Sequence, residues 1–147
     1  MPLEVEVVSR VRRLYHTDHA DMVIIPGSEG EMGVLPNHTP LLTTLAFGEL
    51  RIVEGGDVVS FVVYGGVVEV RPDKVTVLAD DAESVYELDM TQIEDARNRA
   101  RDLMAASPSE AQRAEIAQEL RRVEIAAKVH GRVQARGQRV RSLGDGN

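Results

Sequence analysis

Residues 30–51 (GEMGVLPNHTPLLTTLAFGELR) constrain the fold more than any other part of the chain. The stretch mixes turn formers with aliphatic residues: Gly30, Gly33, Pro36, Asn37, Pro40 and Gly48 beside Val34, Leu35, Leu41, Leu42 and Leu45. A surface loop rarely carries so many apolar residues, and a regular strand or helix rarely carries so many breakers. The stretch therefore predicts a short strand, a tight corner and a return across a packed β layer.

Residues 3–8 (LEVEVV) show the alternation of apolar and polar residues that is typical of a strand with one solvated face, and residues 10–15 continue or pair with this strand. Residues 20–25 predict another strand, ended by Pro26 and Gly27. Gly55 and Gly56 suit a hairpin turn between residues 49–53 and 58–64, and residues 71–73 suit a second turn between 67–70 and 74–78. Such short strands predict an antiparallel sandwich or barrel.

After residue 87 the composition changes from branched aliphatics to Ala, Arg, Glu and Gln. Asp89 and Gln92 resemble a capping pair, and apolar residues at three- and four-residue steps predict a helix over residues 89–106. The run SPSE at residues 107–110 predicts a cap at Ser107, proline at the first helical position and a second helix to about residue 135. A short loop between them makes the two helices an antiparallel hairpin.

We therefore expect an all-β sandwich followed by an α-helical hairpin, with domains at residues 1–87 and 88–147. The net charge of −7 divides unevenly: the first part has six basic and 15 acidic residues, the second 11 basic and nine acidic. Opposite signs suggest different partners for the two parts, or each other as partner. The apolar stripe of the hairpin is mostly alanine, which buries little area, so we expect a weakly docked, movable arm.

Several function classes are disfavoured by what the sequence lacks. There is no cysteine, which removes thiol catalysis, disulfides and thiolate metal sites and fits a reducing compartment. No charged segment followed by an apolar run opens the chain, so we expect no signal peptide. No uncharged apolar stretch approaches the roughly 18 residues of a membrane span, so any membrane association should go through a partner.

Two clusters could be drawn as ligand sites, and each has a structural interpretation. Glycines recur at every third position from residue 27 to residue 33, but a strand follows them and no lysine lies near. Turn glycines are therefore favoured over a phosphate-binding loop. His16 and His19, with Asp18 and Asp21, could hold a metal. Because their segment is predicted as strand and loop, surface residues at a turn are favoured.

His38 lies in the corner between Pro36 and Pro40. It is interpreted as a hydrogen-bonded corner residue or an interface contact. Catalysis would need an orienting acid and a nucleophile, and the sequence offers no convincing pair. We therefore predict no catalytic residue, no cofactor and no metal ligand.

Two charged segments are candidate contact surfaces. Glu29 and Glu31 flank Gly30 at a loop tip, either as solvated charge or as an acidic contact surface. The carboxyl end is basic, with Glu124 as its only acid over residues 121–141: Arg121, Arg122, Lys128, Arg132, Arg136, Arg139 and Arg141. These cations form a solvated helix face, a nucleic-acid site, or a contact for an acidic protein surface reached when the arm extends. The negative overall charge and the lack of an aromatic platform disfavour nucleic acid.

The order of these parts resembles the epsilon subunit of the F-type ATP synthase. The matching stretches are LEVEVVS at residues 3–9, GSEGEMGVLPNHTPLLTTLAFGELRI at 27–52, YGGVVEVRPDKVTVLADDAE at 64–83, and the Ala/Arg/Glu-rich hairpin after Leu88. Together they cover nearly the whole chain.

The resemblance implies a sandwich of about ten strands and a two-helix hairpin in a non-catalytic rotor subunit of the central stalk. Such a subunit couples proton flow to ATP synthesis, binds the gamma subunit and the ring of c subunits, and lies peripherally on the cytoplasmic side of the cell membrane. In many bacterial members the hairpin extends along gamma toward an acidic region of the beta subunits and blocks ATP hydrolysis. By position, Glu31 matches the tip facing the c-ring and His38 the corner near gamma. The interface residues that we expect are Glu29, Glu31, His38, Arg121, Arg122, Lys128 and Arg132.

Some members of this family bind ATP at the hairpin through an Ile/Leu-Asp-x-x-Arg-Ala motif and arginines of the second helix. Here Asp89 is kept, but Gln92 and Ile93 replace the arginine and alanine, and Val129 and Val133 stand at the second-helix arginine positions. Because these cations are missing, we expect weak or absent ATP binding, with Asp89 as a residual match.

The leading hypothesis is thus a coupling and regulatory subunit without chemistry of its own. The alternative is an ATP-sensing module that binds nucleotide at the hairpin. A small β-fold enzyme is disfavoured because no acid and base are paired in a plausible cleft. A nucleic-acid-binding tail would show binding that falls steeply with added salt.

Overall fold

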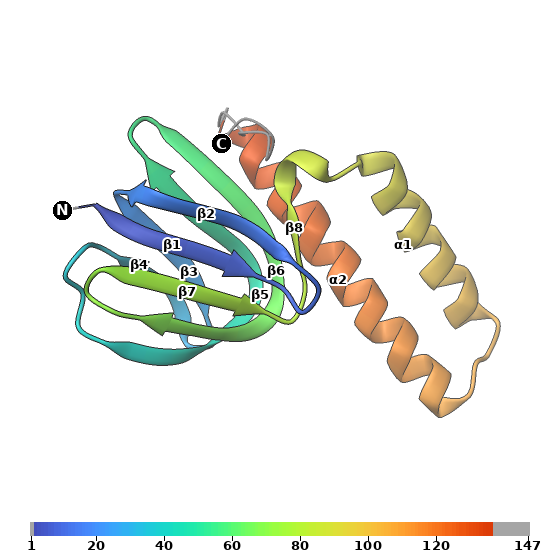
Figure 1. The fold of residues 1–147 in the computed structure, drawn as a ribbon. Coiled ribbons are helices and arrows are strands. Elements are labelled where there is room, and N and C mark those ends of the chain that lie inside the picture. The colour runs from blue at the N-terminus through green and yellow to red at the C-terminus, as the bar shows by residue number, and fades with distance from the viewer. Residues whose placement is uncertain (1, 137–147) are drawn as a thin grey trace.

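The chain folds into a β body followed by two helices (Figure 1), and the computed structural model describes residues 2–136. The strands are β1 (Leu3–Val8), β2 (Arg13–Ala20), β3 (Met22–Gly27), β4 (Gly30–Val34), β5 (Leu41–Glu54), β6 (Asp57–Val70), β7 (Lys74–Ala79) and β8 (Ala82–Ser84). A 3-10 turn, η1 (Val85–Glu87), leads to the helices α1 (Met90–Ala105) and α2 (Glu110–Ala135).

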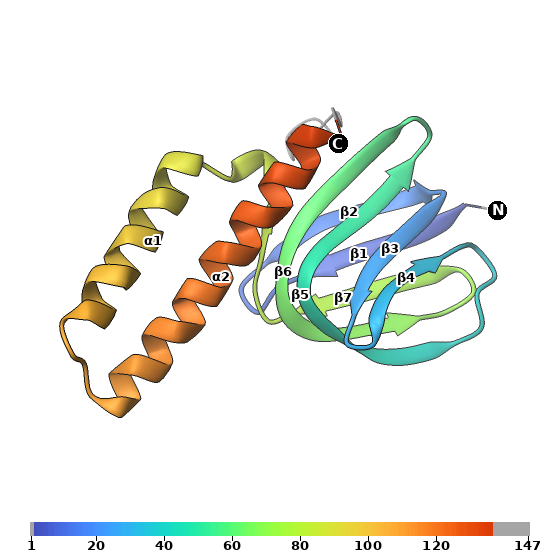
Figure 2. The same cartoon turned by 180° about the vertical axis from the view of Figure 1, so that it is seen from behind.

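Hydrogen bonds join the eight described strands into one sheet that folds over on itself as two layers (Figures 1 and 2). The strand order is β2-β1-β7-β6-β5-β3-β4, and β8 pairs with β6. β1 and β7 run parallel, while the other neighbouring strands run antiparallel. The predicted class, a β-sandwich followed by a helical hairpin, is confirmed.

The described residues form eight strands where the resemblance implied about ten. The reason lies in β5 and β6, each of 14 residues, which stay paired from Leu41 and Val70 to Glu54 and Asp57. Each passes from one layer into the other without a break (Figure 2), so segments predicted as separate strands are continuous. Gly55 makes the predicted turn between them with a positive φ of 59°.

The strand predicted to end before Pro26 continues through it to Gly27. Proline has no N–H to give to a ladder, so it is tolerated in a strand at irregular positions. Here the pairing of β3 with β5 shifts between Ile24 and Gly27, where Pro26 lies.

The core lies between the two layers and consists mainly of branched aliphatic residues. Fully buried members include Val5, Val7, Leu50, Ile52 and Phe61. In β1 the buried and half-buried residues alternate strictly, as its sequence predicted. Burial of this apolar surface, at roughly 25 cal/mol per Å², is the main force that stabilises the sandwich.

Both helices begin at side-chain caps. The Asp89 side chain accepts a hydrogen bond from the Thr91 N–H, which confirms Asp89 as the cap of α1. The cap predicted at Ser107 is wrong: α2 is capped by Ser109, which forms a reciprocal capping box with Gln112. Ser107 has a φ of 54° and lies in the loop between the two helices. Neither helix within residues 2–136 has the length and apolar character needed to cross a bilayer.

Candidate functional site at the junction of hairpin and sandwich

α2 lies against the sandwich, and α1 lies on the far side of α2 (Figures 1 and 2). Val129 and Val133 of α2 are buried against Val62 and Tyr64 of β6 and Val85 of η1. A second cluster joins the helices to each other through Ile93, Val123 and Ala126. The docking surface therefore depends on valines near the end of α2, whereas the sequence pattern had drawn attention to alanines.

Two arginines of α2 contact aromatic side chains of the sandwich. The Arg121 guanidinium lies 4.2 Å from the centroid of the Phe47 ring, and that of Arg122 lies 4.4 Å from the Tyr64 ring. Arg122 also donates a hydrogen bond of 2.5 Å to Oδ2 of Asp81. A cation over an aromatic face contributes about 0.5–1 kcal/mol at exposed sites and more when desolvated. In this conformation both arginines thus help to hold the hairpin down.

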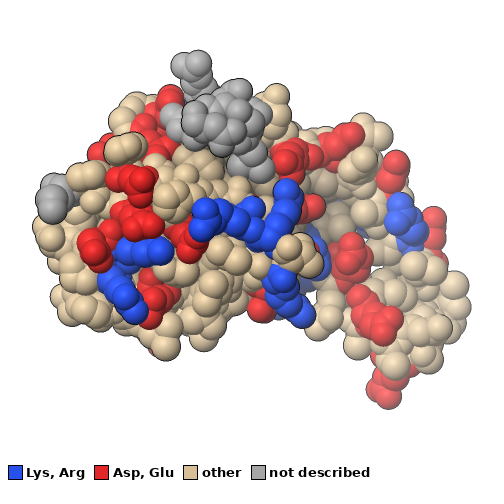
Figure 3. Space-filling view, in the orientation of Figure 1, with Lys and Arg blue, Asp and Glu red and all other residues tan. Residues whose placement is uncertain are grey.

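The other predicted basic residues of α2 differ in their surroundings. Lys128 and Arg132 are exposed. Arg136, at the end of α2, donates a 2.6 Å hydrogen bond to the buried Glu49. Arg139 and Arg141 lie outside the described residues. Figure 3 shows basic side chains gathered where the sandwich meets the hairpin, with acidic side chains around them.

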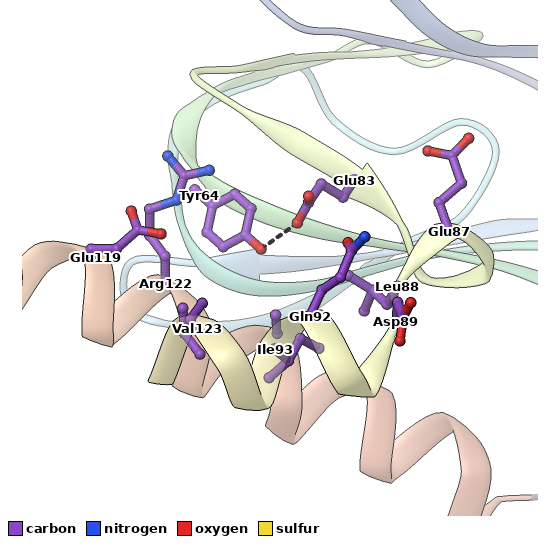
Figure 4. A pocket seen from close by; sticks show the side chains of 12 residues that line it. Tyr64, Glu83, Glu87, Leu88, Asp89, Gln92, Ile93, Glu119, Arg122 and Val123 are labelled. Atoms are coloured by element: carbon purple, nitrogen blue, oxygen red, sulfur yellow. Dashed lines mark hydrogen bonds between the residues drawn. The ribbon is translucent and has the colours of Figure 1, made fainter. Parts of the chain in front are cut away.

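A pocket of about 180 Å³ lies where α1, α2 and the sandwich meet (Figure 4). Its acidic lining residues are Glu83, Glu87, Asp89 and Glu119. Among the described residues that line it, Arg122 is the single basic one, and its charge is already matched by Asp81. The excess of carboxylates makes the pocket repel a phosphate chain.

The hydroxyl of Tyr64 donates a 2.8 Å hydrogen bond to Oε2 of Glu83 across this pocket (Figure 4). Burial raises the pKa of Tyr64 far above its ordinary value of 10, and the hydrogen bond to the Glu83 carboxylate raises it further. Tyr64 therefore stays protonated near neutral pH. It acts there as a fixed hydrogen-bond donor and as an aromatic surface for Arg122.

Asp89, Val129 and Val133, which stand at the positions of the nucleotide motif, make contacts that hold the fold together. The Asp89 carboxylate accepts a 2.8 Å hydrogen bond from the N–H of Thr91. Val129 and Val133 pack on the sandwich, and the α2 arginine that lines the pocket is Arg122. Position in sequence had not identified Arg122 as a pocket residue. Weak ATP binding stays a prediction, now supported by the acidic lining.

The acidic tip is the turn of the β3–β4 hairpin. Gly27 and Gly30 pair at its ends, and Gly30 has a φ of 127°, as expected of a turn glycine. Glu29 and Glu31 are both exposed. Glu31 is paired with Arg51 of β5, whose Nη2 lies 2.8 Å from its Oε1.

His38 lies in the loop between β4 and β5. Its Nδ1 is 2.7 Å from the Thr39 carbonyl oxygen, and its N–H donates to the Leu35 carbonyl. The loop is tied to the β6–β7 turn by a hydrogen bond from the Asn37 N–H to the Pro72 carbonyl. These contacts make His38 a half-buried residue of a well-fixed corner, as one of its two interpretations predicted.

Near this corner an apolar strip crosses the outside of the sheet. Thr44 of β5 pairs with Val67 of β6, Val67 pairs with Leu78 of β7, and Leu78 pairs with Val8 of β1. Paired residues point to the same side of a sheet, as does Leu42, two positions before Thr44. Leu42 is 70% exposed and Leu78 49% exposed. We call Val8, Leu42, Thr44, Val67 and Leu78 the apolar strip.

His16 and His19 do not come together as a metal pair within the described part of the chain. His16 Nε2 instead lies 3.0 Å from Oε2 of Glu4 and 3.6 Å from Oδ1 of Asp18. Lys74 Nζ is 3.5 Å from the same Glu4 oxygen. The hydrogen bond with His16 lowers the pKa of Glu4, and Lys74 lowers it further. Because Lys74 already neutralises Glu4, we interpret the group as a surface ion-pair network.

Comparison with known proteins identifies relatives for nearly the whole chain. The beta-sandwich domain family of the ATP synthase Delta/Epsilon chain matches residues 2–85. The ATP synthase epsilon chain of Herpetosiphon aurantiacus is 42% identical over 131 residues, covering 88% of this chain and 94% of the relative. That of Hydrogenovibrio crunogenus is 38% identical over 139 residues, covering 92% of this chain and 96% of the relative.

Solved structures share the fold. A chain in the cryo-EM structure of the Euglena gracilis mitochondrial ATP synthase, OSCP/F1/c-ring in rotational state 1, superposes with a TM-score of 0.67 at 25% identity. The match covers 93% of this chain and 82% of that chain.

Proposed function

Because this chain belongs to the family of ATP synthase epsilon chains, non-catalytic subunits of the F-type ATPase, we propose that it is a rotor subunit of the central stalk. In this role the sandwich couples proton flow through the membrane ring to ATP synthesis, and the hairpin inhibits ATP hydrolysis. The assembled complex holds the chain peripherally on the cytoplasmic side of the cell membrane. The observation that supports the proposal is a β body with an exposed apolar strip and an exposed acidic tip, beside a helical hairpin that two arginines hold against it.

The apolar strip is the surface we assign to the gamma subunit. Contiguous exposed apolar residues on a folded protein mark interaction sites. Leu42, Val67 and Leu78 present such a surface on three neighbouring strands. The corner that holds His38 precedes β5, the strand that carries Leu42, so His38 fits the rim of the same contact.

The tip with Glu29 and Glu31 is the surface we assign to the c-ring. Two carboxylates on a short hairpin turn suit a basic or polar loop of a facing protein. The tip is short and its strands are paired along their length, from Val23 and Val34 to Gly27 and Gly30. It can therefore transmit force without bending.

The hairpin inhibits, in this proposal, by exchanging its partners. Arg121 and Arg122 contact Phe47, Tyr64 and Asp81 when the hairpin is docked. Once released, they join Lys128 and Arg132 as cations available to an acidic surface of the beta subunits. The same side chains thus stabilise one position or the other. We infer a domain boundary between residues 87 and 88, where η1 gives way to the linker before α1.

Deleting residues 88–147 tests this function in the assembled complex. We expect residues 1–87 to co-purify with gamma and the c-ring, and ATP hydrolysis by the complex to rise severalfold. The control is the same complex reconstituted with the full chain. Unchanged hydrolysis would remove the inhibitory role, and loss of co-purification would contradict the assignment of the contacts to the sandwich.

A further inference from the structure

Four charged residues form an ionic chain from the acidic tip to the end of α2: Glu31, Arg51, Glu49 and Arg136. Nη2 of Arg51 lies 2.8 Å from Oε1 of Glu31, and Nη2 of Arg136 lies 2.6 Å from Oε2 of Glu49. The middle link is longer, with Nε of Arg51 at 3.9 Å from Oε1 of Glu49. Arg51 thus lies between two carboxylates and makes its closer ion pair with Glu31.

The centre of this ionic chain is buried. The side chain of Glu49 is 2% exposed, and that of Arg51 is 19% exposed. Among the described residues, Nε of Arg51 is a buried donor that lacks a hydrogen-bond partner. A buried carboxylate that loses its cation is strongly destabilising. Arg136 supplies the close cation for Glu49, while Arg51 keeps an unused donor near the same carboxylate.

We propose that Arg51 couples the surroundings of Glu31 to the docking of α2. A basic side chain of a partner protein that pairs with Glu31 frees Arg51 from that carboxylate. Arg51 then moves onto Glu49 and neutralises it. When Arg136 then leaves with the end of α2, Glu49 still has Arg51 as its cation. Contact at the tip therefore favours the released hairpin.

This coupling rests on the proposed function, in which the tip faces the c-ring and the hairpin changes position. It also specifies which position of the hairpin assembly favours. Assembly on the ring shifts the hairpin toward the inhibitory position, whereas the isolated chain keeps it docked. The partner it requires is cationic at the point that meets Glu31, because only a cation competes with Arg51 for that carboxylate.

The test measures the ratio of released to docked hairpin in the full chain. The sequence has no cysteine, so cysteines placed at the exposed positions Gly56 and Gln118 take spin labels specifically. Pulsed electron paramagnetic resonance then gives the distance distribution between sandwich and α2. Glu31→Gln should raise the released-to-docked ratio about threefold, the size of effect of a partly exposed ion pair. Arg136→Gln should raise it about tenfold or more, because Glu49 is buried.

The decisive comparison is the double variant. In an Arg51→Gln background, Glu31→Gln should have no effect on the ratio, because Arg51 carries the coupling. The matched control is Glu29→Gln, which removes a neighbouring exposed charge with no contact to Arg51 and should leave the ratio unchanged. If Arg51→Gln does not fold, Arg51→Lys is the second background. Lysine has a single nitrogen and so cannot contact both carboxylates through different nitrogens, as arginine can. In the Arg51→Lys background, the effect of Glu31→Gln on the released-to-docked ratio should therefore fall to about half or less.

Two results would overturn the coupling. The first is an equal response to Glu31→Gln and Glu29→Gln, which would show a general charge effect. The second is a Glu31→Gln effect that persists undiminished without Arg51. Either result leaves the rotor assignment standing, because the measurement uses the isolated chain. Conversely, unchanged hydrolysis after deletion of the hairpin would remove the proposed inhibition without altering these distance ratios.

Discussion

Gly66 lies where the backbones of β6 and β7 approach each other closely. It has a φ of 136°, a conformation essentially reserved for glycine. A Cβ at this position would lie 2.2 Å from the Leu78 carbonyl oxygen and 2.9 Å from the Cα of Ala79. Both are backbone atoms of β7, which cannot move aside as a flexible side chain would. The close approach of β6 and β7 therefore requires glycine here.

We predict that Gly66→Ala lowers the free energy of unfolding by about 3 kcal/mol or more, since backbone strain and a backbone clash add. Urea denaturation of the full chain measures the change. Gly56→Ala is the matched control: its Cβ would meet nothing within 4 Å, and its φ is not positive. The control should be neutral or slightly stabilising. Equal destabilisation by the two variants would contradict the argument.

The charges that line the pocket disfavour nucleotide binding. The pocket carries Glu83, Glu87, Asp89 and Glu119 against Arg122, whose charge Asp81 already balances. We expect titration calorimetry of the full chain with Mg-ATP to show no binding tighter than about 1 mM, or about 4 kcal/mol of binding free energy. Gln92→Arg, which restores a cation to the lining, should strengthen binding. A submillimolar affinity of the natural chain would refute the expectation.

At the scale of the elements, the sequence predicted those features that depend on neighbouring residues alone. Alternation in residues 3–8 predicted β1 with its bounds, and Asp89 predicted the cap of α1. The cap of α2 was misplaced because both Ser107 and Ser109 precede the helix, and only the reciprocal bonds with Gln112 distinguish them. The unbroken run of β5 and β6 could not be predicted, because pairing along 14 residues overrides the turn formers within them.

Contacts between elements were the least predictable part of the candidate site. The sequence indicated that Arg121 and Arg122 belong to a basic contact surface, but their docked partners, Phe47, Tyr64 and Asp81, lie far away in the chain. In the sequence, Val129 was noted because it stands where some family members have an arginine. In the structure it is one of the residues that pack α2 against the sandwich. A signal was present in the valines at positions 129 and 133, four residues apart on one helix face.

For the whole molecule, the uneven charge has a structural consequence. The sequence left open whether the acidic and basic parts serve different partners or each other. In the docked conformation they serve each other, through Arg122 with Asp81 and Arg136 with Glu49. These pairs weaken when other charges compete for them or when salt screens them. A partner of either sign can therefore shift the hairpin, from the acidic tip or from the basic face of α2.

The two parts should also differ in local stability. The sandwich core is built from fully buried Val, Leu, Ile and Phe, whereas α1 buries only Ile93 and Ala100 within its described length. Because apolar burial stabilises by about 25 cal/mol per Å², an alanine-rich contact opens at a lower free energy. We predict that in hydrogen–deuterium exchange of the full chain, amides of α1 exchange fastest among the regular elements. Those of α2 should be intermediate, and those of β1, β5, β6 and β7 slowest.

The internal control for that measurement is Val133→Ala, which removes a docking residue from α2 and leaves the sandwich core intact. It should speed exchange in α1 and α2 together and leave the slowest strands unchanged, because the hairpin then opens more often while the sandwich stays folded. If the hairpin of the natural chain were protected as strongly as the core strands, or if the variant sped exchange equally everywhere, the two parts would unfold as one cooperative unit. A hairpin bound that firmly could not leave the sandwich without unfolding it, and the exchange of partners on which inhibition depends would be physically excluded.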